Sequence, residues 1–304
     1  STPNGFKQVA SEQNAHLFMF NLKTLSLQSG FGTAGVMDLG ATNTANSFVG
    51  DISAADFDLD VTTNAAYFGT TQGLDTEDST GTVWPDLNLD GVPDSSDGLY
   101  EEWSGKLFRM RIEPGASAAT HQWAVDVMYD PDSPIVSRPA VSFDENLNRW
   151  LYFGTGRFFT TGDAVDNTDG QIVGIKEPRS ANGEFIAETT GIGVAIPAIS
   201  TAVVDVTDAV VIEETGALSG VSTPFALAEN TVQALDTMQS GYDDATQYLN
   251  GWKKDLDLPL TNNIAYRGER AMGSSVVLGG FVLQSTYAPE NSSCSVIGAA
   301  QLYA

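Results

Sequence analysis

Short apolar runs separated by turn-forming residues recur along the chain, and this pattern limits the possible folds more than any other feature. Residues 17–22, 64–70 and 106–112 are three such runs, and Gly, Asn, Asp and Thr are frequent between them. Comparable runs cover residues 121–126, 139–143, 149–153, 171–175, 200–206, 209–212, 274–278 and 281–285. Apolar runs of about four to eight residues bounded by such turns are typical of β-strands. We therefore predict an all-β fold in which residues 1–304 form one domain.

Two hairpins and one helical segment can be placed within this pattern. Residues 139–143 and 149–153 flank the polar stretch 144–148, which predicts a hairpin with a polar tip. The pair Gly279–Gly280 interrupts an apolar run and predicts the turn of a second hairpin. Residues 224–249 differ, because they contain helix formers and their apolar residues recur every three or four positions. We expect a short helical insertion there.

The motif aromatic-Gly-Thr occurs at the end of two predicted strands, in Tyr67–Thr70 and in Tyr152–Gly156. Each copy follows an apolar run and a loop rich in carboxylates, and such self-similarity favours a β-propeller. At four strands per blade, roughly twelve to fourteen strands make three or four blades, and a closed propeller usually needs more. We therefore predict a partial β-propeller.

Residues 86–97 carry the motif with the most specific chemistry. If Asp86 is the first position of a loop, side-chain oxygens fall at the first, third, fifth, ninth and twelfth positions, and Gly91 is at the sixth. This is the spacing of a calcium-binding EF-hand loop, with Asp in place of Glu at the last position. Ca²⁺ takes about six to eight oxygen ligands at ~2.3–2.6 Å, and alternate residues of a tight loop can point inward together. The predicted ligands are Asp86, Asn88, Asp90, the backbone carbonyl of Val92, Asp94 and Asp97.

The predicted cofactor is therefore Ca²⁺, held in an EF-hand-like loop on a β scaffold. The alternative for residues 86–97 is a solvated acidic loop between two strands, because Asp-Gly turns are common in β proteins. A second acidic run, 56–60 with Asn64, has the same first three positions. It has Val61 where the loop needs glycine and Tyr67 where it needs an acid. We expect this second run to form a turn before the next strand and not a calcium site.

The balance of charged residues excludes two classes of partner. Asp and Glu number 39 and Lys and Arg number 14, which gives a formal net charge of −25. Binding to nucleic acid or to anionic lipid needs basic residues that match phosphate. No stretch approaches the ~18 apolar residues of a membrane span. Because only 17% of the residues are charged, the surface must consist largely of Thr, Ser, Asn, Gln and Gly, which is more typical of secreted proteins.

The few Cys and His residues narrow the chemistry further. The single cysteine, Cys294, excludes a disulfide within the chain and a thiolate zinc site. It is either a buried free thiol or paired with a cysteine outside this chain, and the sequence leaves both open. His16 and His121 are far apart, which argues against a His-rich catalytic zinc site. His121 lies next to Trp123 and fits a packed strand residue better than a metal ligand.

Other motifs are weaker. Residues 30–35 fit the pattern GxGxxG but lack the strand, helix and parallel α/β context that a dinucleotide site needs. Glu101 and Glu102 are adjacent, and adjacent strand residues point to opposite faces, so they do not form a glycosidase pair. The five Trp residues fit core or blade-interface positions better than sugar stacking. No acid–base constellation stands out, so we predict a protein that is not an enzyme.

The order of these motifs resembles the C-terminal β-propeller domain of the PilY family, the large type IV pilus biogenesis and tip-adhesin proteins. The resemblance extends from about residue 48 to the C-terminus, whereas residues 178–250 match poorly. Its segments are the loop 86–94 with Tyr100 and 103–109; 138–143 with 152–157 and Asp163; Gly251 and Trp252; and 268–270, 275–279, Ser285, Thr286, Pro289, Cys294 and Gly298.

The resemblance implies an extracellular protein of a pilus tip or cell surface. It implies that calcium on the propeller loop regulates pilus extension and retraction, and that the protein contributes to attachment to a host or abiotic surface. It assigns calcium ligands to Asp86, Asn88, Asp90, the Val92 carbonyl and Asp94, and implies minor pilins of the pilus tip as partners. The family's earlier blades have no counterpart in these residues. We therefore expect an upstream PilY-like region or a partner subunit to complete the propeller and cover its open sheet edges.

Two alternatives to a calcium-binding pilus protein remain open. One is a secreted propeller enzyme, either quinoprotein-like or active on glycans, which would need a central polar site. The other is a purely structural subunit of a surface filament, in which calcium only stiffens a loop.

Overall fold

The computed structural model describes residues 13–74, 102–113, 121–159, 163, 168–180, 182–196, 198–199, 203–208, 210–211, 218–219, 250–257, 268–290 and 298–304. Strands predominate in these residues, and the helices among them are two single turns, α2 (Ala41–Thr44) and α3 (Ile186–Thr189). The predicted all-β class is confirmed. The helical insertion expected near 224–249 lies outside the described residues. No helix within the described part is long and apolar enough to cross a membrane.

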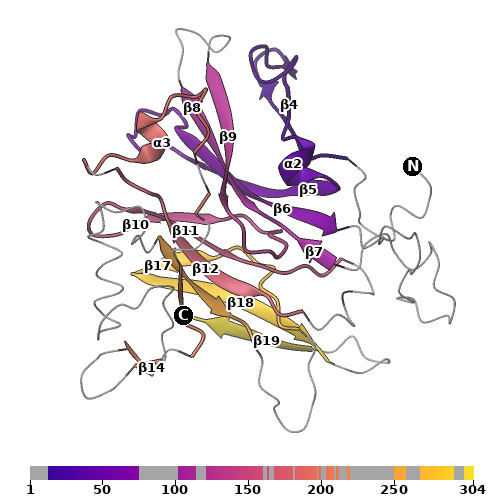
Figure 1. The fold of residues 1–304 in the computed structure, drawn as a ribbon, viewed down its shortest axis with the longest axis vertical. Coiled ribbons are helices and arrows are strands. Elements are labelled where there is room, and N and C mark those ends of the chain that lie inside the picture. Colours follow the sequence, from indigo (N-terminus) through magenta and orange to yellow (C-terminus); the bar gives the residue numbers. More distant parts are fainter. Residues whose placement is uncertain are drawn as a thin grey trace, which may run out of the picture.

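An N-terminal arm of short strands precedes three larger sheets (Figure 1). In the arm, β1 pairs with β4 and β2 pairs with β3; the bounds are β1 (His16–Phe18), β2 (Phe20–Asn21), β3 (Ser26–Leu27) and β4 (Val36–Asp38). The first sheet has the order β5-β6-β8-β9, with β7 also paired to β6. Its strands are β5 (Ser47–Ala55), β6 (Ala65–Leu74), β7 (Glu102–Ser104), β8 (Leu107–Glu113) and β9 (Gln122–Tyr129).

The second and third sheets follow in chain order. The second has the order β10-β11-β12-β16-β13, with strands β10 (Ala140–Phe143), β11 (Arg149–Gly154), β12 (Gln171–Lys176), β13 (Val203–Asp205) and β16 (Gly251–Asp255). The third consists of β17 (Val276–Leu278), β18 (Phe281–Pro289) and β19 (Gly298–Tyr303). β14 (Val210–Val211) pairs antiparallel with β15 (Leu218–Ser219). Within the three larger sheets the neighbours pair antiparallel, except that β13 lies parallel to β16.

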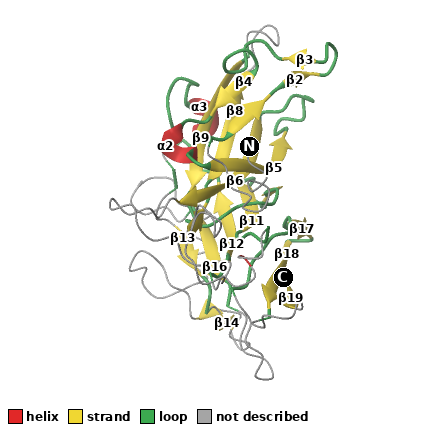
Figure 2. Ribbon diagram, turned by 90° about the vertical axis from the view of Figure 1, so that its right-hand side faces the viewer, coloured by secondary structure: helices red, strands yellow, loops and turns green. Residues whose placement is uncertain are grey.

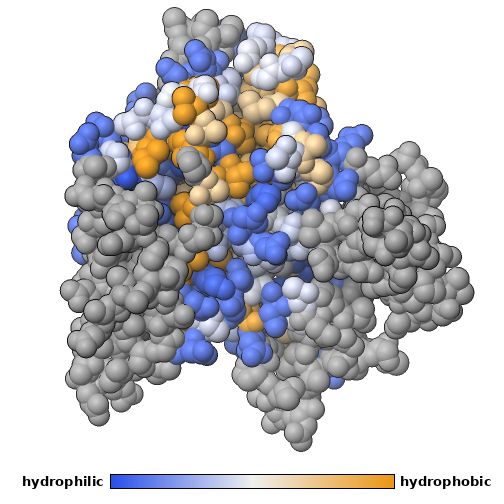
Figure 3. All heavy atoms as spheres, in the orientation of Figure 1, coloured by the Kyte–Doolittle hydropathy of each residue, from blue (hydrophilic) through white to orange (hydrophobic). Residues whose placement is uncertain are grey.

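Clusters of buried apolar side chains lie between neighbouring sheets and hold them together. Phe31 of the arm packs edge-on against Trp123 of β9, within a cluster that also contains Phe68 and Phe108 of the first sheet. A second cluster joins the first and second sheets and includes Tyr67, Leu107 and Phe153. In a third cluster, Ile172 of the second sheet, Leu256 and Ala271 pack with Tyr303 of the third sheet. The chain is thus a stack of sheets (Figure 2). Figure 3 shows apolar side chains gathered in the upper half of one face, where Figure 1 places the arm and the first sheet.

Both predicted hairpins form. β10 and β11 pair as far as Phe143 opposite Arg149, and the side chain of Asp144 accepts the backbone N–H groups of Asn146 and Asn148 at the polar tip. Leu278 pairs with Phe281 across the predicted turn at Gly279–Gly280. Gly279 and Gly280 have φ of 59° and 88°, a left-handed conformation that glycine adopts at little cost.

The first copy of the aromatic-Gly-Thr motif joins the first sheet to the segment around Ile135, which precedes the second sheet. Thr70 is fully buried: its N–H donates to the Lys106 carbonyl (3.0 Å), its hydroxyl accepts the Lys106 N–H (3.1 Å), and its carbonyl accepts the Ile135 N–H (3.0 Å). A Cβ on Gly69 would lie 2.2 Å from Cγ2 of Ile135. Glycine is therefore required for the segment containing Ile135 to approach β6 closely.

The second copy makes the same contacts one sheet further along. The Thr155 N–H donates to the Gln171 carbonyl (2.9 Å), its hydroxyl accepts the Gln171 N–H (2.8 Å), and its carbonyl accepts the Ala271 N–H (2.9 Å). A Cβ on Gly154 would lie 2.2 Å from Cβ of Ala271. The repeated motif therefore marks a repeated junction between consecutive sheets. The predicted propeller-like repetition is confirmed for the two sheets that contain the motif.

Candidate functional site

The predicted calcium ligands of residues 86–97 lie outside the described residues, but the strands on either side of them are described. β6 ends at Leu74 and β7 begins at Glu102, and these two residues are directly opposite each other in an antiparallel pair. Residues 86–97 therefore belong to a connection whose two ends are fixed at neighbouring positions of the first sheet. The expectation that the acidic segment is not flanked by two helices concerns residues outside the described part of the chain and stays a prediction.

The strand that leaves this connection packs against the junction of the second sheet. Trp103 of β7 lies under the guanidinium of Arg157, with the Arg157 Cζ 3.4 Å from the ring centroid. Arg157 is buried and is held by Asp163 through Nε–Oδ1 (2.8 Å) and Nη2–Oδ2 (3.1 Å) contacts. Arg270 donates to the Asp163 backbone carbonyl (2.5 Å). The strand that follows the acidic connection therefore contacts, through Trp103, the residues Arg157 and Asp163, which lie between the second and third sheets.

The second acidic run, between β5 and β6, brings three carboxylates together. One oxygen from each of Asp56, Asp58 and Asp60 lies within 4.8 Å of the others. The Asp56 carboxylate already accepts the backbone N–H groups of Leu59 and Val61, both at 2.8 Å. These hydrogen bonds explain Asp56 as a turn-forming residue, in agreement with the predicted turn before β6.

A buried network of charges lies between the first and second sheets. Arg109 of β8 and Glu177, which directly follows β12, form an ion pair with Nη1–Oε1 at 3.2 Å, and their side chains are 2% and 0% exposed. The Tyr67 hydroxyl donates to the same Glu177 oxygen at 2.6 Å. Burial, followed by the charge of Glu177 and the hydrogen bond to it, raises the pKa of Tyr67 well above its ordinary value. Tyr67 therefore remains a hydrogen-bond donor at neutral pH.

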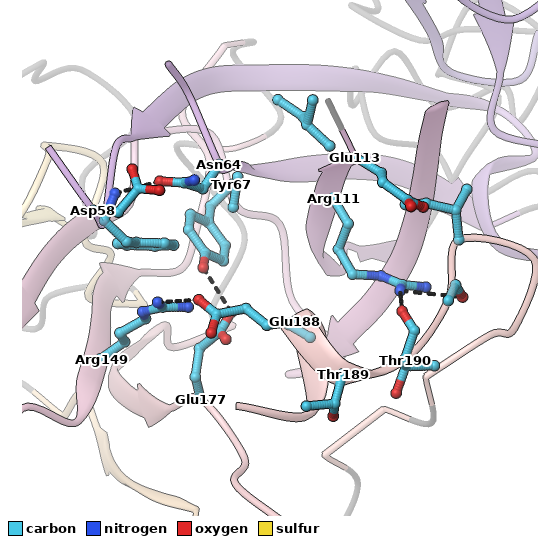
Figure 4. A pocket seen from close by; sticks show the side chains of 16 residues that line it. Asp58, Asn64, Tyr67, Arg111, Glu113, Arg149, Glu177, Glu188, Thr189 and Thr190 are labelled. Carbon is cyan, nitrogen blue, oxygen red and sulfur yellow. Dashed lines mark hydrogen bonds and ion pairs between the residues drawn. The ribbon is translucent and has the colours of Figure 1, made fainter. Parts of the chain in front are cut away.

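Arg111, two residues further along β8, has a different set of partners. Its Nε lies 2.6 Å from Oδ2 of Asp126 on β9, and its Nη atoms donate to the carbonyls of Thr190 (2.6 Å) and Val194 (2.8 Å). Asp126 also accepts the Ile196 N–H at 3.0 Å. Arg111 and Asp126 thus fasten the loop after α3 to the first sheet. Figure 4 shows Arg111 and Thr190.

Sequence analysis did not identify this network. Arg109 and Arg111 alternate with apolar residues along β8, which alone does not distinguish a buried face from an exposed one. Glu177 lies 68 residues from Arg109 and 110 from Tyr67, so no local spacing links them. The nearest signal is the pair of arginines that alternate with Leu107, Phe108, Met110 and Ile112 in β8.

The weaker motifs have structural roles among the described residues. Residues 30–35 form the turn between β3 and β4, and no helix follows them directly within the described segment 13–74. Of the Trp residues that the structure describes, Trp150 stacks on Tyr152 at 5.9 Å between ring centroids and Trp252 contacts Tyr152 at 6.2 Å. His121 contacts Trp123 edge-on at 6.1 Å. Glu101 and Cys294 lie outside the described residues.

The stack of antiparallel sheets with a repeated Gly-Thr junction defines an all-β, propeller-like fold. Among solved structures it is similar to the crystal structure of the Pseudomonas aeruginosa PilY1 C-terminal domain, with a TM-score of 0.50 and 14% sequence identity. The alignment covers 90% of this chain and 50% of that structure, so the chain spans about half of its length. No family model and no curated protein sequence matches the chain. At this identity the similarity establishes the fold.

Proposed function

We propose that this chain is a calcium-binding, non-enzymatic component of a type IV pilus, located outside the cell, that supports pilus assembly, extension and retraction, and surface attachment. The observation that carries the proposal is the similarity of its fold to the PilY1 C-terminal domain. The acidic segment 86–97 and the fixed ends of its connection in the first sheet support the calcium assignment.

The calcium chemistry follows from the predicted ligands. Without a cation, the carboxylates of Asp86, Asp90, Asp94 and Asp97 repel one another within one short segment. Ca²⁺ replaces this repulsion with coordination by hard oxygens. If Ca²⁺ binds the folded chain and not the unfolded chain, it stabilises the folded state by mass action.

The contacts of β7 provide a route from this segment to the rest of the fold. Trp103 lies one residue into β7 and is stacked on Arg157, which belongs to the second sheet's junction. We propose that ordering of the acidic connection by Ca²⁺ stabilises this stack, so that calcium strengthens the junction between sheets. Extension and retraction apply force to a pilus protein, and a calcium-dependent junction would change its resistance to that force.

A calcium titration tests the metal assignment. We expect Ca²⁺ to raise the melting temperature and to protect residues 75–101 from proteolysis, and we expect Asp90→Ala to lose both effects. Asp58→Asn is the matched control, because it removes one carboxylate from the other acidic run. A variant Asp90→Ala that responds to Ca²⁺ as the parent chain does would contradict the proposed site.

The third sheet supports the proposal that another blade completes the propeller. Pairing places Val276, Leu278, Phe281 and Leu302 on one face, and they are 55%, 67%, 64% and 69% exposed. On the opposite face Gln284, Thr286 and Ala288 are buried against the rest of the molecule. Exposed apolar faces of this kind mark interaction surfaces. We propose that a further blade, from an upstream PilY-like region or a partner subunit, covers it.

The test changes only this face. Leu278→Asp with Phe281→Asp should lower self-association and dye binding of the isolated chain, measured by light scattering and by fluorescence of a dye that binds apolar surfaces. A control pair, Ser142→Asp with Glu145→Asp, changes residues of the second sheet and its hairpin. A strictly monomeric parent chain that binds no dye would contradict the exposed face.

A further inference from the structure

A cavity of 680 Å³ is lined by the first sheet, the second sheet and the loop after α3 (Figure 4). Its size is within the range of cavities that hold small ligands, about 300–1,000 Å³. Apolar groups form part of the wall, namely Phe57, Ala65, Ile112, Ala187 and Ile192. Charged side chains form much of the remaining wall. Whether each of them already has an ion-pair or hydrogen-bond partner decides which kind of ligand the cavity can bind.

The two cationic side chains in the wall are already neutralised. Arg111 is bound to Asp126 and to backbone carbonyls of the loop after α3. The guanidinium of Arg149 lies between the rings of Phe57 and Phe185, with its Cζ 3.7 and 3.8 Å from their centroids, and it is also paired with Glu188. Each guanidinium in the wall therefore has a carboxylate partner, although Nε of Arg149 is a buried donor without a hydrogen-bond partner.

The carboxylates in the wall, in contrast, are not all paired with a cation or a hydrogen-bond donor. Glu177 is 0% exposed at its side chain, and both Arg109 and Tyr67 are bound to its Oε1. Its Oε2 is buried with no hydrogen-bond partner. A buried carboxylate oxygen without a donor is costly, and a ligand that donates a hydrogen bond would satisfy it once the side chains that cover this oxygen move aside. Asp58 and Glu113, at the exposed rim, have no ion-pair partner among the described residues.

The arrangement does not suit a divalent metal. Within the described part of the chain, Asp56, Asp58 and Asp60 are the group of three or more acidic or metal-ligating residues whose ligand atoms converge within 4.8 Å. Of these three only Asp58 lines the cavity, and Glu177 and Glu113 are not in the group. The acids of the cavity are spread around an apolar wall. An alkyl chain fits such a wall, and a charged end group fits the acids, as when lysine buries its methylene stem and keeps its ammonium in a polar setting.

We propose that this cavity binds a primary alkylammonium group, whose methylenes pack against Phe57 and Ile112 and whose ammonium donates to Glu177, with Asp58 and Glu113 adding attraction at the rim. The proposal goes beyond the proposed pilus function and does not depend on it. Two sources can supply this group: a lysine side chain on a partner protein, or a small diamine in solution.

Isothermal titration tests the proposal with the full chain in 0.15 M NaCl and 1 mM CaCl₂. The probes are 1,5-diaminopentane and Nα-acetyl-lysine methylamide, and the neutral control is Nα-acetyl-norleucine methylamide, which has the stem without the ammonium. We expect at least one ammonium probe to bind with 1:1 stoichiometry and the norleucine compound to show no binding. Binding of the lysine compound indicates a partner's lysine as the natural source, and binding of the diamine alone indicates a small molecule.

Variants locate the site. Asp58→Asn with Glu113→Gln changes only exposed rim residues and should weaken binding by roughly 5-fold, as expected for exposed charges. Glu177→Gln should abolish binding, with circular dichroism showing whether the chain still folds. Glu145→Gln removes an exposed acid from the hairpin between β10 and β11 and should leave affinity unchanged. Absence of binding by both ammonium probes, equal binding of the norleucine compound, or equal weakening by Glu145→Gln and by the rim variant would each overturn the proposal.

Discussion

Replacement of Arg109 by Met tests whether the buried charges between the first two sheets stabilise the fold. Arg109→Met keeps most of the side-chain volume and leaves Glu177 buried with Tyr67 as its remaining hydrogen-bond donor. Because the two side chains are 2% and 0% exposed, solvent cannot compensate the carboxylate. Breaking one partner of such a buried pair costs about 3–5 kcal/mol. We expect a loss of stability in this range.

The assay is urea unfolding followed by tryptophan fluorescence. With a slope of about 3 kcal/mol per molar urea, the expected loss lowers the unfolding midpoint by roughly 1 M or more. The matched control is Lys106→Met, which breaks the ion pair of Lys106 with Asp130, whose side chains are 21% and 41% exposed. Exposed pairs contribute about 0–1 kcal/mol.

A second variant isolates the charge pair itself. Arg109→Met combined with Glu177→Gln removes both charges, so it should be less destabilised than the sum of the single variants. If Arg109→Met costs no more than Lys106→Met, or if the double variant is simply additive, the reasoning about this network is refuted.

Two other predictions concern the repeated junction and one buried lysine. Gly154→Ala should destabilise the chain by about 1–3 kcal/mol, because its Cβ would lie 2.2 Å from Cβ of Ala271, whereas Gly191→Ala, which meets nothing within 4 Å, should have little effect on the melting temperature; equal effects of the two changes would contradict the close-approach argument. Burial lowers the pKa of Lys176 to about 8 from an ordinary 10.5. Between these values the unfolded chain binds more protons than the folded chain, so the free energy of unfolding should rise with pH by up to about 1.4 kcal/mol per unit. Lys176→Met should remove this rise when unfolding is measured at pH 7.5 and pH 9.5, and an unchanged pH profile in that variant would refute the assignment to Lys176.

Local patterns in the sequence predicted much of the fold. The hairpins at 144–148 and Gly279–Gly280 were predicted because the residues that form a tight turn are adjacent in the chain. The aromatic-Gly-Thr motif occurs twice in the sequence, and the structure supplies the reason, since Thr70 and Thr155 occupy equivalent junctions. Such features depend on turn chemistry and on close approach, and both leave a mark in a few consecutive residues.

The features that sequence did not predict depend on contacts between distant segments. Glu177 follows an apolar strand and resembles an ordinary exposed strand end, yet folding brings it to Arg109 and Tyr67. The parallel pairing of β13 with β16 is likewise a consequence of how the second sheet assembles. Neither leaves a local signal, because the partners are separated by tens of residues. The predicted ligands 86–97 stay a prediction from spacing.

The central claim, that residues 86–97 bind calcium, is tested most directly by a crystal structure of the chain grown in calcium-replete buffer. We predict one Ca²⁺ ion in that segment, with about six to eight oxygen ligands at ~2.3–2.6 Å that include Asp86, Asn88, Asp90, the Val92 carbonyl and Asp94. An ordered segment that contains no ion, with these side chains directed into solvent, would contradict the account.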